Sequence, residues 1–142
     1  MRLVDANVLL YAVNERAVQH ETAKAWLDRS LVGAETIGFT WNACLAFLRV
    51  ATHPRVFARP LSSDDATSLV REWLAAPAAM ILEPTQRHID IVGDLLHDSG
   101  VGGNLVNDAH LAALALEHDA TVVSFDTDFM RFAKVAWERP SI

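Results

Sequence analysis

Short apolar runs and longer amphipathic segments alternate along this chain. Four runs of strand length predict buried strands, at residues 2–5, 35–39, 79–83 and 121–125. The run TVVSF at 121–125 is the clearest, because its two valines are β-branched and helical patterns lie on both sides of it. A further apolar triplet, VAW at 135–137, predicts an edge strand.

The segments between these runs carry apolar side chains at helical spacing. They predict a helix from Asn7 onward and helices over 19–31, 41–53 (N-cap Thr40), 64–76 (N-cap Ser62 or Ser63), 85–97 and 105–119 (N-cap Asn104). The glycine-containing segment DSGVGGN at 98–104 predicts a loop. Strands that alternate with helices are typical of an α/β fold with a mainly parallel central sheet flanked by helices. At 142 residues, the chain is expected to form one domain.

Composition indicates a globular protein rather than a disordered one, with 51% hydrophobic and 21% charged residues. Cys44 is the only cysteine, which excludes an intramolecular disulfide. We expect a cytoplasmic protein without membrane contact, because the sequence shows neither a signal-peptide pattern nor a bilayer-length apolar stretch of about 20 residues. The net charge of -6 argues against a protein that coats nucleic acid duplexes. It does not exclude a nucleic-acid enzyme, because metal-binding carboxylates themselves add negative charge.

Acidic residues follow two of the predicted strands. Asp5 ends the first strand, Asp126 and Asp128 follow TVVSF, and Asp108 lies in the first turns of the helix after the glycine loop. Sites in parallel α/β sheets form beyond the carboxyl ends of strands, so these residues are expected to converge. Carboxylates at close range repel one another unless a cation lies among them, and hard divalent ions prefer oxygen ligands. The pattern predicts metal-assisted phosphodiester hydrolysis, with Asn7 fixing the geometry of Asp5.

Each acid also has a simpler structural interpretation. An aspartate after a strand is commonly a helix cap or a turn residue. Asp108 could interact with the positive end of its helix, Asp126 could cap a short helix, and Asp128 could be solvated. Only the combination of all four at this spacing favours a metal site.

The ordered set of motifs resembles the PIN-domain family, and within it the VapC-type toxins of bacterial toxin–antitoxin pairs. The matching stretches are LVDANVLLYAVN with its D-x-N, HETAKAWLD, LAFLRVATHPRVF and GNLVNDAHLAALALEHDATVVSFDTDFMRF. Each motif alone has low specificity. Their order and the chain length together are specific.

This resemblance implies a three-layer PIN-like fold over residues 1–142 and an endoribonuclease that depends on Mg²⁺ or Mn²⁺. It also implies an RNA substrate, a small VapB-type antitoxin that blocks the site, and a homodimer. By position, Asp5, Asp108 and Asp126 match the family's metal-binding acids, and Asp128 matches a further catalytic acid. Asn7 and Ser124 match polar positions that support the metal site.

One position departs from the family pattern. Many members carry a glutamate in the central helix, where this chain has Ala46. Metal binding could be looser, or another acid such as Glu21 or Glu83 could substitute. A catalytically degenerate PIN domain that acts as a binding module remains the alternative. Phosphoryl-transfer folds fit less well, because Asn7 stands where a phosphoaspartate phosphatase would need a second aspartate.

Other conspicuous residues have less specific interpretations. The six histidines lack the paired spacing of a zinc site. The helix over 41–50 is apolar almost all round and is expected to be buried, in the core or in an interface. The tryptophans are interpreted as core or interface anchors rather than base-stacking platforms. The basic stretch is interpreted as a solvated surface, which could alternatively bind RNA or an antitoxin. These two sets are Trp26, Trp41, Trp73 and Trp137, and Arg49, His53, Arg55 and Arg59.

Overall fold

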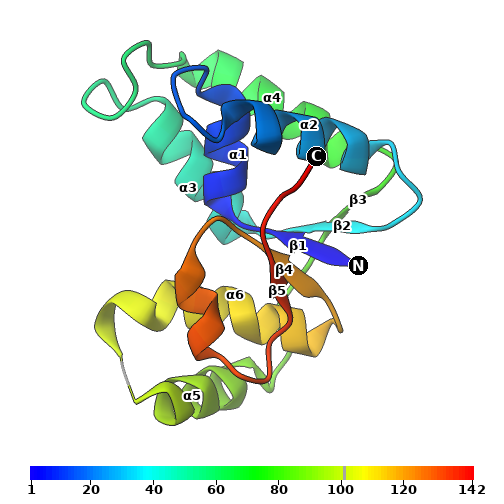
Figure 1. The fold of residues 1–142 in the computed structure, drawn as a ribbon, viewed down its shortest axis with the longest axis vertical. Coiled ribbons are helices and arrows are strands. Elements are labelled where there is room, and N and C mark those ends of the chain that lie inside the picture. Colours follow the sequence, from blue (N-terminus) through cyan, green and yellow to red (C-terminus); the bar gives the residue numbers. More distant parts are fainter. Residues whose placement is uncertain (101) are drawn as a thin grey trace.

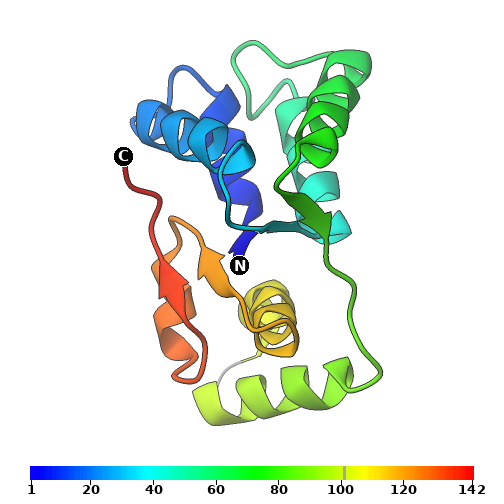
Figure 2. The same ribbon diagram turned by 90° about the vertical axis from the view of Figure 1, so that its right-hand side faces the viewer.

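The central feature of the fold is a five-stranded, all-parallel sheet. A computed structural model describes residues 1–100 and 102–142. The strands lie in the order β3-β2-β1-β4-β5 (Figures 1 and 2). Their bounds are β1 (Arg2–Val4), β2 (Ile37–Phe39), β3 (Ala79–Ile81), β4 (Thr121–Val123) and β5 (Trp137–Glu138). The predicted α/β class with a parallel sheet is confirmed, although the observed strands are shorter than the apolar runs.

Helices cover both faces of the sheet and make a three-layer structure (Figure 1). One face is covered by α1 (Ala6–Val13), α2 (His20–Leu31), α3 (Trp41–Ala51) and α4 (Ser63–Ala75). The other is covered by α5 (His88–Ser99), α6 (Val106–Glu117) and the 3₁₀ helices η1 (Gly103–Leu105) and η2 (Thr127–Arg131). None of the described helices is long and apolar enough to span a membrane.

Side chains alternate across the sheet, as the pleat requires. Val4 and Val123 pack into the core under α1 to α4, whereas Leu3 and Val122 pack into the core over α5 and α6. All four side chains are fully buried. Each helical layer therefore has its own apolar core, and the two cores share the sheet between them.

Local capping explains the starts of α3 and α4. Thr40 and Ser62 accept hydrogen bonds from the backbone N–H groups of Ala43 (3.0 Å) and Asp65 (3.1 Å), as predicted for these N-caps. The predicted start at Thr85 is wrong, because α5 begins at His88. Thr85 lies before the helix, and its backbone N–H donates to Glu117 Oε1 at 2.9 Å.

The boundary at the glycine loop also differs from the prediction. Asn104 does not cap α6, because it lies inside η1 and the helix follows directly from Leu105. α5 extends into the predicted loop and closes at Gly100, which adopts the left-handed conformation with φ 70°. The predicted loop also includes residue 101, which lies outside the described residues.

α3 is buried in the core on one face only, so complete burial in the core is not observed. Burial of its other face in an interface stays a prediction. Cys44 and Phe47 point into the core, whereas Trp41 is 47% exposed and Leu45 is 59% exposed. Trp26 and Trp73 are buried, as expected of core anchors. The exposed apolar side chains of α3 lie at helical spacing on one side of it, with Leu45 one turn after Trp41.

The order of the strands reverses at β1. The chain runs from β1 through β2 to β3 on one side, and β4 and β5 then pair on the other side. Val4 of β1 is in register with Val123 of β4, so the residues that follow these strands emerge side by side. Ligands of open α/β sheets bind at such reversal points, beyond the carboxyl ends of the strands.

Candidate metal centre at the reversal of the sheet

Asp5 and Ser124, which follow β1 and β4, are joined by a hydrogen-bond network. The Ser124 hydroxyl donates to Asp5 Oδ2 at 2.6 Å and accepts from Asn7 Nδ2 (2.9 Å) and the Asp126 backbone N–H (3.0 Å). Asn7 Nδ2 also donates to Asp5 Oδ2 at 3.2 Å, and Asn7 Oδ1 accepts from the Phe125 backbone N–H. Ser124 is fully buried. The network fixes Asp5 and the start of the loop that carries Asp126.

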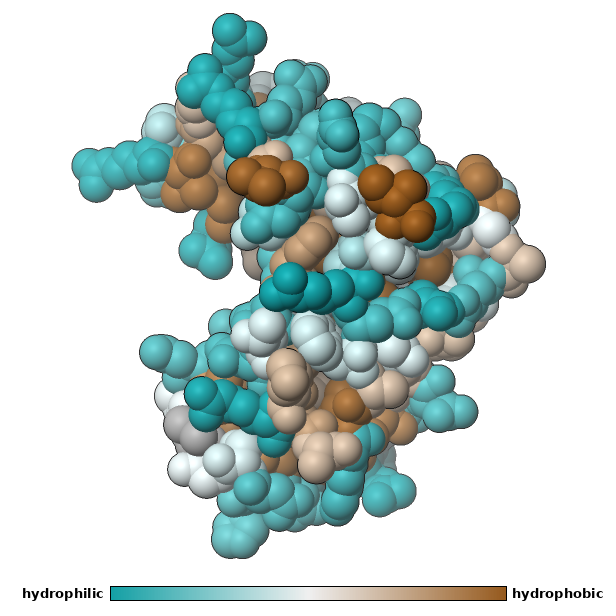
Figure 3. Space-filling model, in the orientation of Figure 1, coloured by the Kyte–Doolittle hydropathy of each residue, from teal (hydrophilic) through white to brown (hydrophobic). Residues whose placement is uncertain are grey.

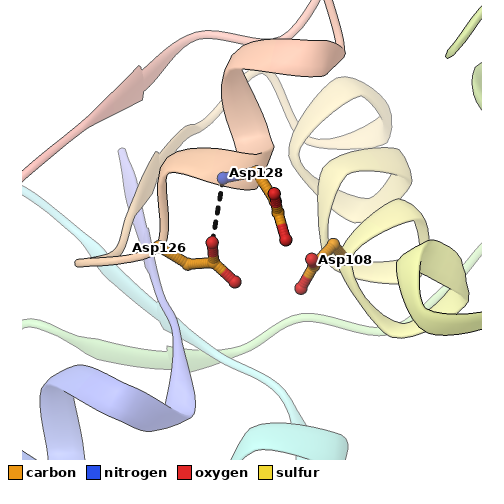
Figure 4. A group of neighbouring side chains, drawn as sticks. All are labelled: Asp108, Asp126 and Asp128. Carbon is orange, nitrogen blue, oxygen red and sulfur yellow. Dashed lines mark hydrogen bonds between the residues drawn. The ribbon is translucent and has the colours of Figure 1, made fainter.

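Three other carboxylates converge beside this network. Asp108 comes from the first turn of α6, and Asp126 and Asp128 come from the segment between β4 and η2. One oxygen from each lies within 4.8 Å of the others, and the three side chains point toward one another (Figure 4). Asp126 Oδ1 also accepts from the Asp128 backbone N–H at 2.8 Å, which sets the shape of the turn. The described residues thus place Asp128, rather than Asp5, in the tightest group.

The electrostatics of this group are unfavourable without a cation. Burial is the largest cause, and together with repulsion from Asp126, Asp5 and Asp128 it raises the pKa of Asp108 from 3.8 to about 7. The pKa of Asp5 is also raised, chiefly by burial and also by Asp126, against the lowering effect of its hydrogen bonds to Ser124 and Ala6. A divalent ion would relieve this repulsion, and the all-oxygen donor set suits a hard cation such as Mg²⁺ or Mn²⁺. The residues present therefore fit a metal site.

Comparison with known proteins identifies the family. The family model described as "PIN domain" matches residues 2–135. The chain belongs to the PIN-domain family. Its relatives in Mycobacterium tuberculosis include Ribonuclease VapC37, which is 53% identical over 99% of this chain and 97% of its own length. Ribonuclease VapC33 is 44% identical over 99% of this chain and 98% of its own length. This PIN domain therefore groups with the VapC proteins.

Solved structures show the same fold at low sequence identity. The VapBC2 complex of Rickettsia felis, bound to a promoter DNA fragment, aligns with a TM-score of 0.70 and 19% identity over 97% of both chains. M. tuberculosis VapC20, described as a toxin that cleaves the sarcin–ricin loop, aligns with a TM-score of 0.68 and 13% identity. That alignment covers 92% of this PIN domain and 93% of VapC20. The predicted PIN-like three-layer fold is confirmed.

A groove of about 370 Å³ opens beside the acids of this PIN domain. Asp5 and Asp108 line it on one side, and α3 lines it on the other. In the view of Figure 3, the left edge of the molecule is hollowed between the two helical layers. Ala46 lines this groove with Asp5 and Asp108, so the position of the family's central glutamate faces the acids. The described residues place neither Glu21 nor Glu83 among the groove-lining side chains.

Three further polar residues line the groove, and only Arg49 among them is marked in the sequence, as part of the basic stretch. Asn42 and Arg49 of α3 and Asn107 of α6 line the groove. Arg131 lies near the acidic group, with its Nε 3.5 Å from Asp128 Oδ1. Helical spacing could have grouped Asn42 with Ala46 and Arg49, since they lie four and three residues apart.

The histidines nearest the site form a separate cluster between α5 and α6. His88 Nδ1 lies 2.6 Å from Glu117 Oε2, and His88 Nε2 lies 2.8 Å from His110 Nδ1. His110 thus turns away from Asp108 toward α5. A larger cavity of about 640 Å³ also lies between α5 and α6, but none of the four acids lines it. We therefore place the chemistry at the smaller groove, which Asp5 and Asp108 line.

Proposed function

We propose that this protein is a metal-dependent endoribonuclease, the toxin of a type II toxin–antitoxin pair. The observation that carries the proposal is the convergence of Asp108, Asp126 and Asp128 at the reversal of the sheet. The full-length similarity to Ribonuclease VapC37 supports RNA as the substrate. The name of the VapBC2 structural neighbour supports a VapB-type antitoxin as the inhibitory partner. A single domain over 1–142, a homodimer and a cytoplasmic location complete the proposal.

The residues have distinct roles in this proposal. Asp108, Asp126 and Asp128 hold the ion, and Asp5 completes its surroundings, positioned by Asn7 and Ser124. A bound Mg²⁺ or Mn²⁺ would activate water and stabilise the charge that develops on the phosphate. In the hydrolysis, water loses a proton as its oxygen adds to phosphorus, the bond from phosphorus to the ribose oxygen breaks, and that oxygen takes up a proton. The groove beside α3 gives the RNA strand access to the acids.

Cleavage of total cellular RNA by the wild-type protein and by Asp108→Asn tests this function. Asp108 is the best choice, because its carboxylate accepts no hydrogen bond from the described residues, so the amide breaks none of those contacts. We expect discrete wild-type cuts with Mg²⁺ or Mn²⁺, none with EDTA, and none by Asp108→Asn. Asp5→Asn should also be inactive, but it disturbs the network with Ser124 and requires a folding control by circular dichroism.

A binding module is the alternative function, and Ala46 is the observation that favours it. If well-folded wild-type protein and Asp108→Asn leave the RNA equally intact with every metal, the nuclease proposal is wrong. Retained binding of an antitoxin by that inactive protein would then support the binding module.

A further inference from the structure

We propose that the exposed face of α3 is an RNA-binding surface, in which Arg49 binds a backbone phosphate and Trp41 stacks on a base. This inference rests on the proposed ribonuclease function and names the part of the groove that recognises the substrate. Its test is a binding measurement that requires no cleavage.

The first argument is the charge of the groove. Arg49 is the only cationic side chain among the described residues that line it, opposite the carboxylates of Asp5 and Asp108. A phosphate that approached the acids alone would be repelled. A guanidinium on the facing wall supplies attraction, and its planar set of donors matches two phosphate oxygens at once.

The second argument is that Arg49 is unpaired. Within the described parts of the chain, no carboxylate forms an ion pair with its guanidinium, whereas Arg2 pairs with Glu35 and Glu138. Its helical neighbours at three and four residues are Leu45, Ala46, Thr52 and His53, none of which is acidic. The alanine at position 46 therefore leaves Arg49 free to bind an anion.

The third argument is the aromatic side chain at the other end of the same face. Trp41 is 47% exposed and lies one turn before Leu45, which lines the groove. From Trp41 to Arg49 is eight residues, or about 12 Å along a helix, which is long enough to contact successive nucleotides. Asn42 lies between them and offers an amide to a ribose or a base edge. An exposed aromatic side chain and a free cation on one surface are typical of sites that bind single-stranded nucleic acid.

The combination favours RNA over a protein partner as the occupant. An apolar face alone would suit either. The free cation attracts a polyanion whose phosphates repeat along the strand, whereas the acids on the facing wall do not. We therefore propose RNA as the occupant of this face of α3, and the experiment below distinguishes RNA from a protein.

The experiment measures binding of a fluorescein-labelled single-stranded RNA by anisotropy in EDTA, at several salt concentrations. The variants are Arg49→Ala, Arg49→Lys and Trp41→Ala. Arg139→Ala is the matched control, because Arg139 is also exposed but lines a different cavity. Calorimetric Mn²⁺ binding by each variant shows whether the acidic group is intact.

We expect Arg49→Ala to weaken RNA binding about tenfold and to reduce the log–log salt slope by roughly 0.7, the value for one lost phosphate contact on a single strand. Arg49→Lys should restore the slope but only part of the affinity, because an ammonium lacks the bidentate geometry. Trp41→Ala should weaken binding without changing the slope. Arg139→Ala and Mn²⁺ binding should be unaffected.

Two results would overturn the inference. One is unchanged RNA affinity and salt slope in Arg49→Ala, and the other is an equal loss in Arg139→Ala. If either occurs while wild-type cleavage remains metal-dependent, the ribonuclease function stands and a protein partner becomes the better occupant of α3. Loss of wild-type cleavage with the binding pattern intact would contradict the proposed function alone.

Discussion

Single aspartates in this protein combine two roles that the sequence presents as alternatives. Asp5 Oδ1 accepts a hydrogen bond from the Ala6 backbone N–H at 2.7 Å and caps α1. Its Oδ2 accepts hydrogen bonds from the Ser124 hydroxyl and the Asn7 side-chain amide. Asp126 Oδ1 likewise caps η2, and a second oxygen remains for the acidic group. A carboxylate has two oxygens, so capping and ligand binding do not exclude each other.

Asp108 allows a stability prediction, because its ionised form is disfavoured in the fold. We expect Asp108→Asn to raise the free energy of unfolding of the metal-free protein by about 1–2 kcal/mol at pH 8, after allowance for solvent screening of a partly exposed site. The folded pKa of about 7 exceeds the ordinary 3.8, so the wild type gains stability as the pH falls from about 7 toward 4.

The measurement is thermal unfolding of wild type and Asp108→Asn in EDTA at pH 8, 7, 6 and 5. The difference between the two should be largest at pH 8 and should shrink on acidification. A variant that is less stable than wild type at pH 8 would contradict this account of the site.

Position 46 gives a second prediction at the residue scale. Ala46→Glu adds a carboxylate to the groove wall that faces Asp5 and Asp108. We expect Mn²⁺ affinity to rise, because a further oxygen ligand becomes available, and RNA binding in EDTA to fall, because the new acid pairs with Arg49. Calorimetry and anisotropy measure the two effects, with Ala46→Gln as the uncharged control of equal size. An unchanged Mn²⁺ affinity would show that position 46 is too distant from the ion.

At the scale of elements, helix boundaries depend on partners that are distant in sequence. The pattern around Thr85 predicts a helix start, but the Thr85 hydroxyl donates to Glu117 Oε1 of α6 at 2.5 Å and α5 begins only at His88. Thr40 and Ser62 are predicted correctly as N-caps, because each accepts a hydrogen bond from the backbone N–H three residues later in the chain. Local capping is therefore predictable, whereas capping that is overridden by tertiary contacts is not.

Two glycines in regular elements should respond oppositely to alanine. A Cβ on Gly38 of β2 would lie 2.6 Å from Leu82 Cδ1 and 3.3 Å from Leu3 Cδ1, so Gly38→Ala is expected to destabilise by about 1–3 kcal/mol through overpacking. A Cβ on Gly93 of α5 would meet nothing within 4 Å, so Gly93→Ala should stabilise by about 0.5–1 kcal/mol through helix propensity. Urea unfolding measures both. Unchanged stability of Gly38→Ala would contradict the close contact described for β2, and a loss of stability in Gly93→Ala would contradict the open space beside α5.

At the scale of the whole molecule, the fold class is predictable and the pairing of strands is not. Alternation of apolar runs and helical segments indicates a parallel α/β sheet. It does not show that β4 pairs with β1, which depends on how both cores pack. The same holds for the site. Asp5 and Asp126 can be recognised in the sequence because they follow strands. The sequence does not show that Asp128 belongs to the tightest acidic group or that Arg49 has no ion-pair partner among the described residues, because both depend on how the elements pack.

A bound divalent ion should stabilise the molecule as a whole, because its ligands come from separate elements. We expect Mn²⁺ at about 100 times its dissociation constant to add roughly 2.7 kcal/mol to the free energy of unfolding. For a domain of this size that corresponds to a rise in Tm of about 5–10 °C. Differential scanning fluorimetry measures the rise, EDTA should reverse it, and Asp108→Asn should abolish most of it. A Tm that does not respond to Mn²⁺ or Mg²⁺ would contradict the metal centre.

The hydrogen bond from Ser124 to Asp5 joins positions 119 residues apart in the chain. A ribosome synthesises Asp5 early and Ser124, Asp126 and Asp128 much later, so the nascent chain carries one part of the site long before the others. Translation therefore proceeds for most of its course without an assembled acidic group. For an enzyme whose proposed substrate includes the RNA around it, the strand order postpones activity until nearly all of this sequence has been made.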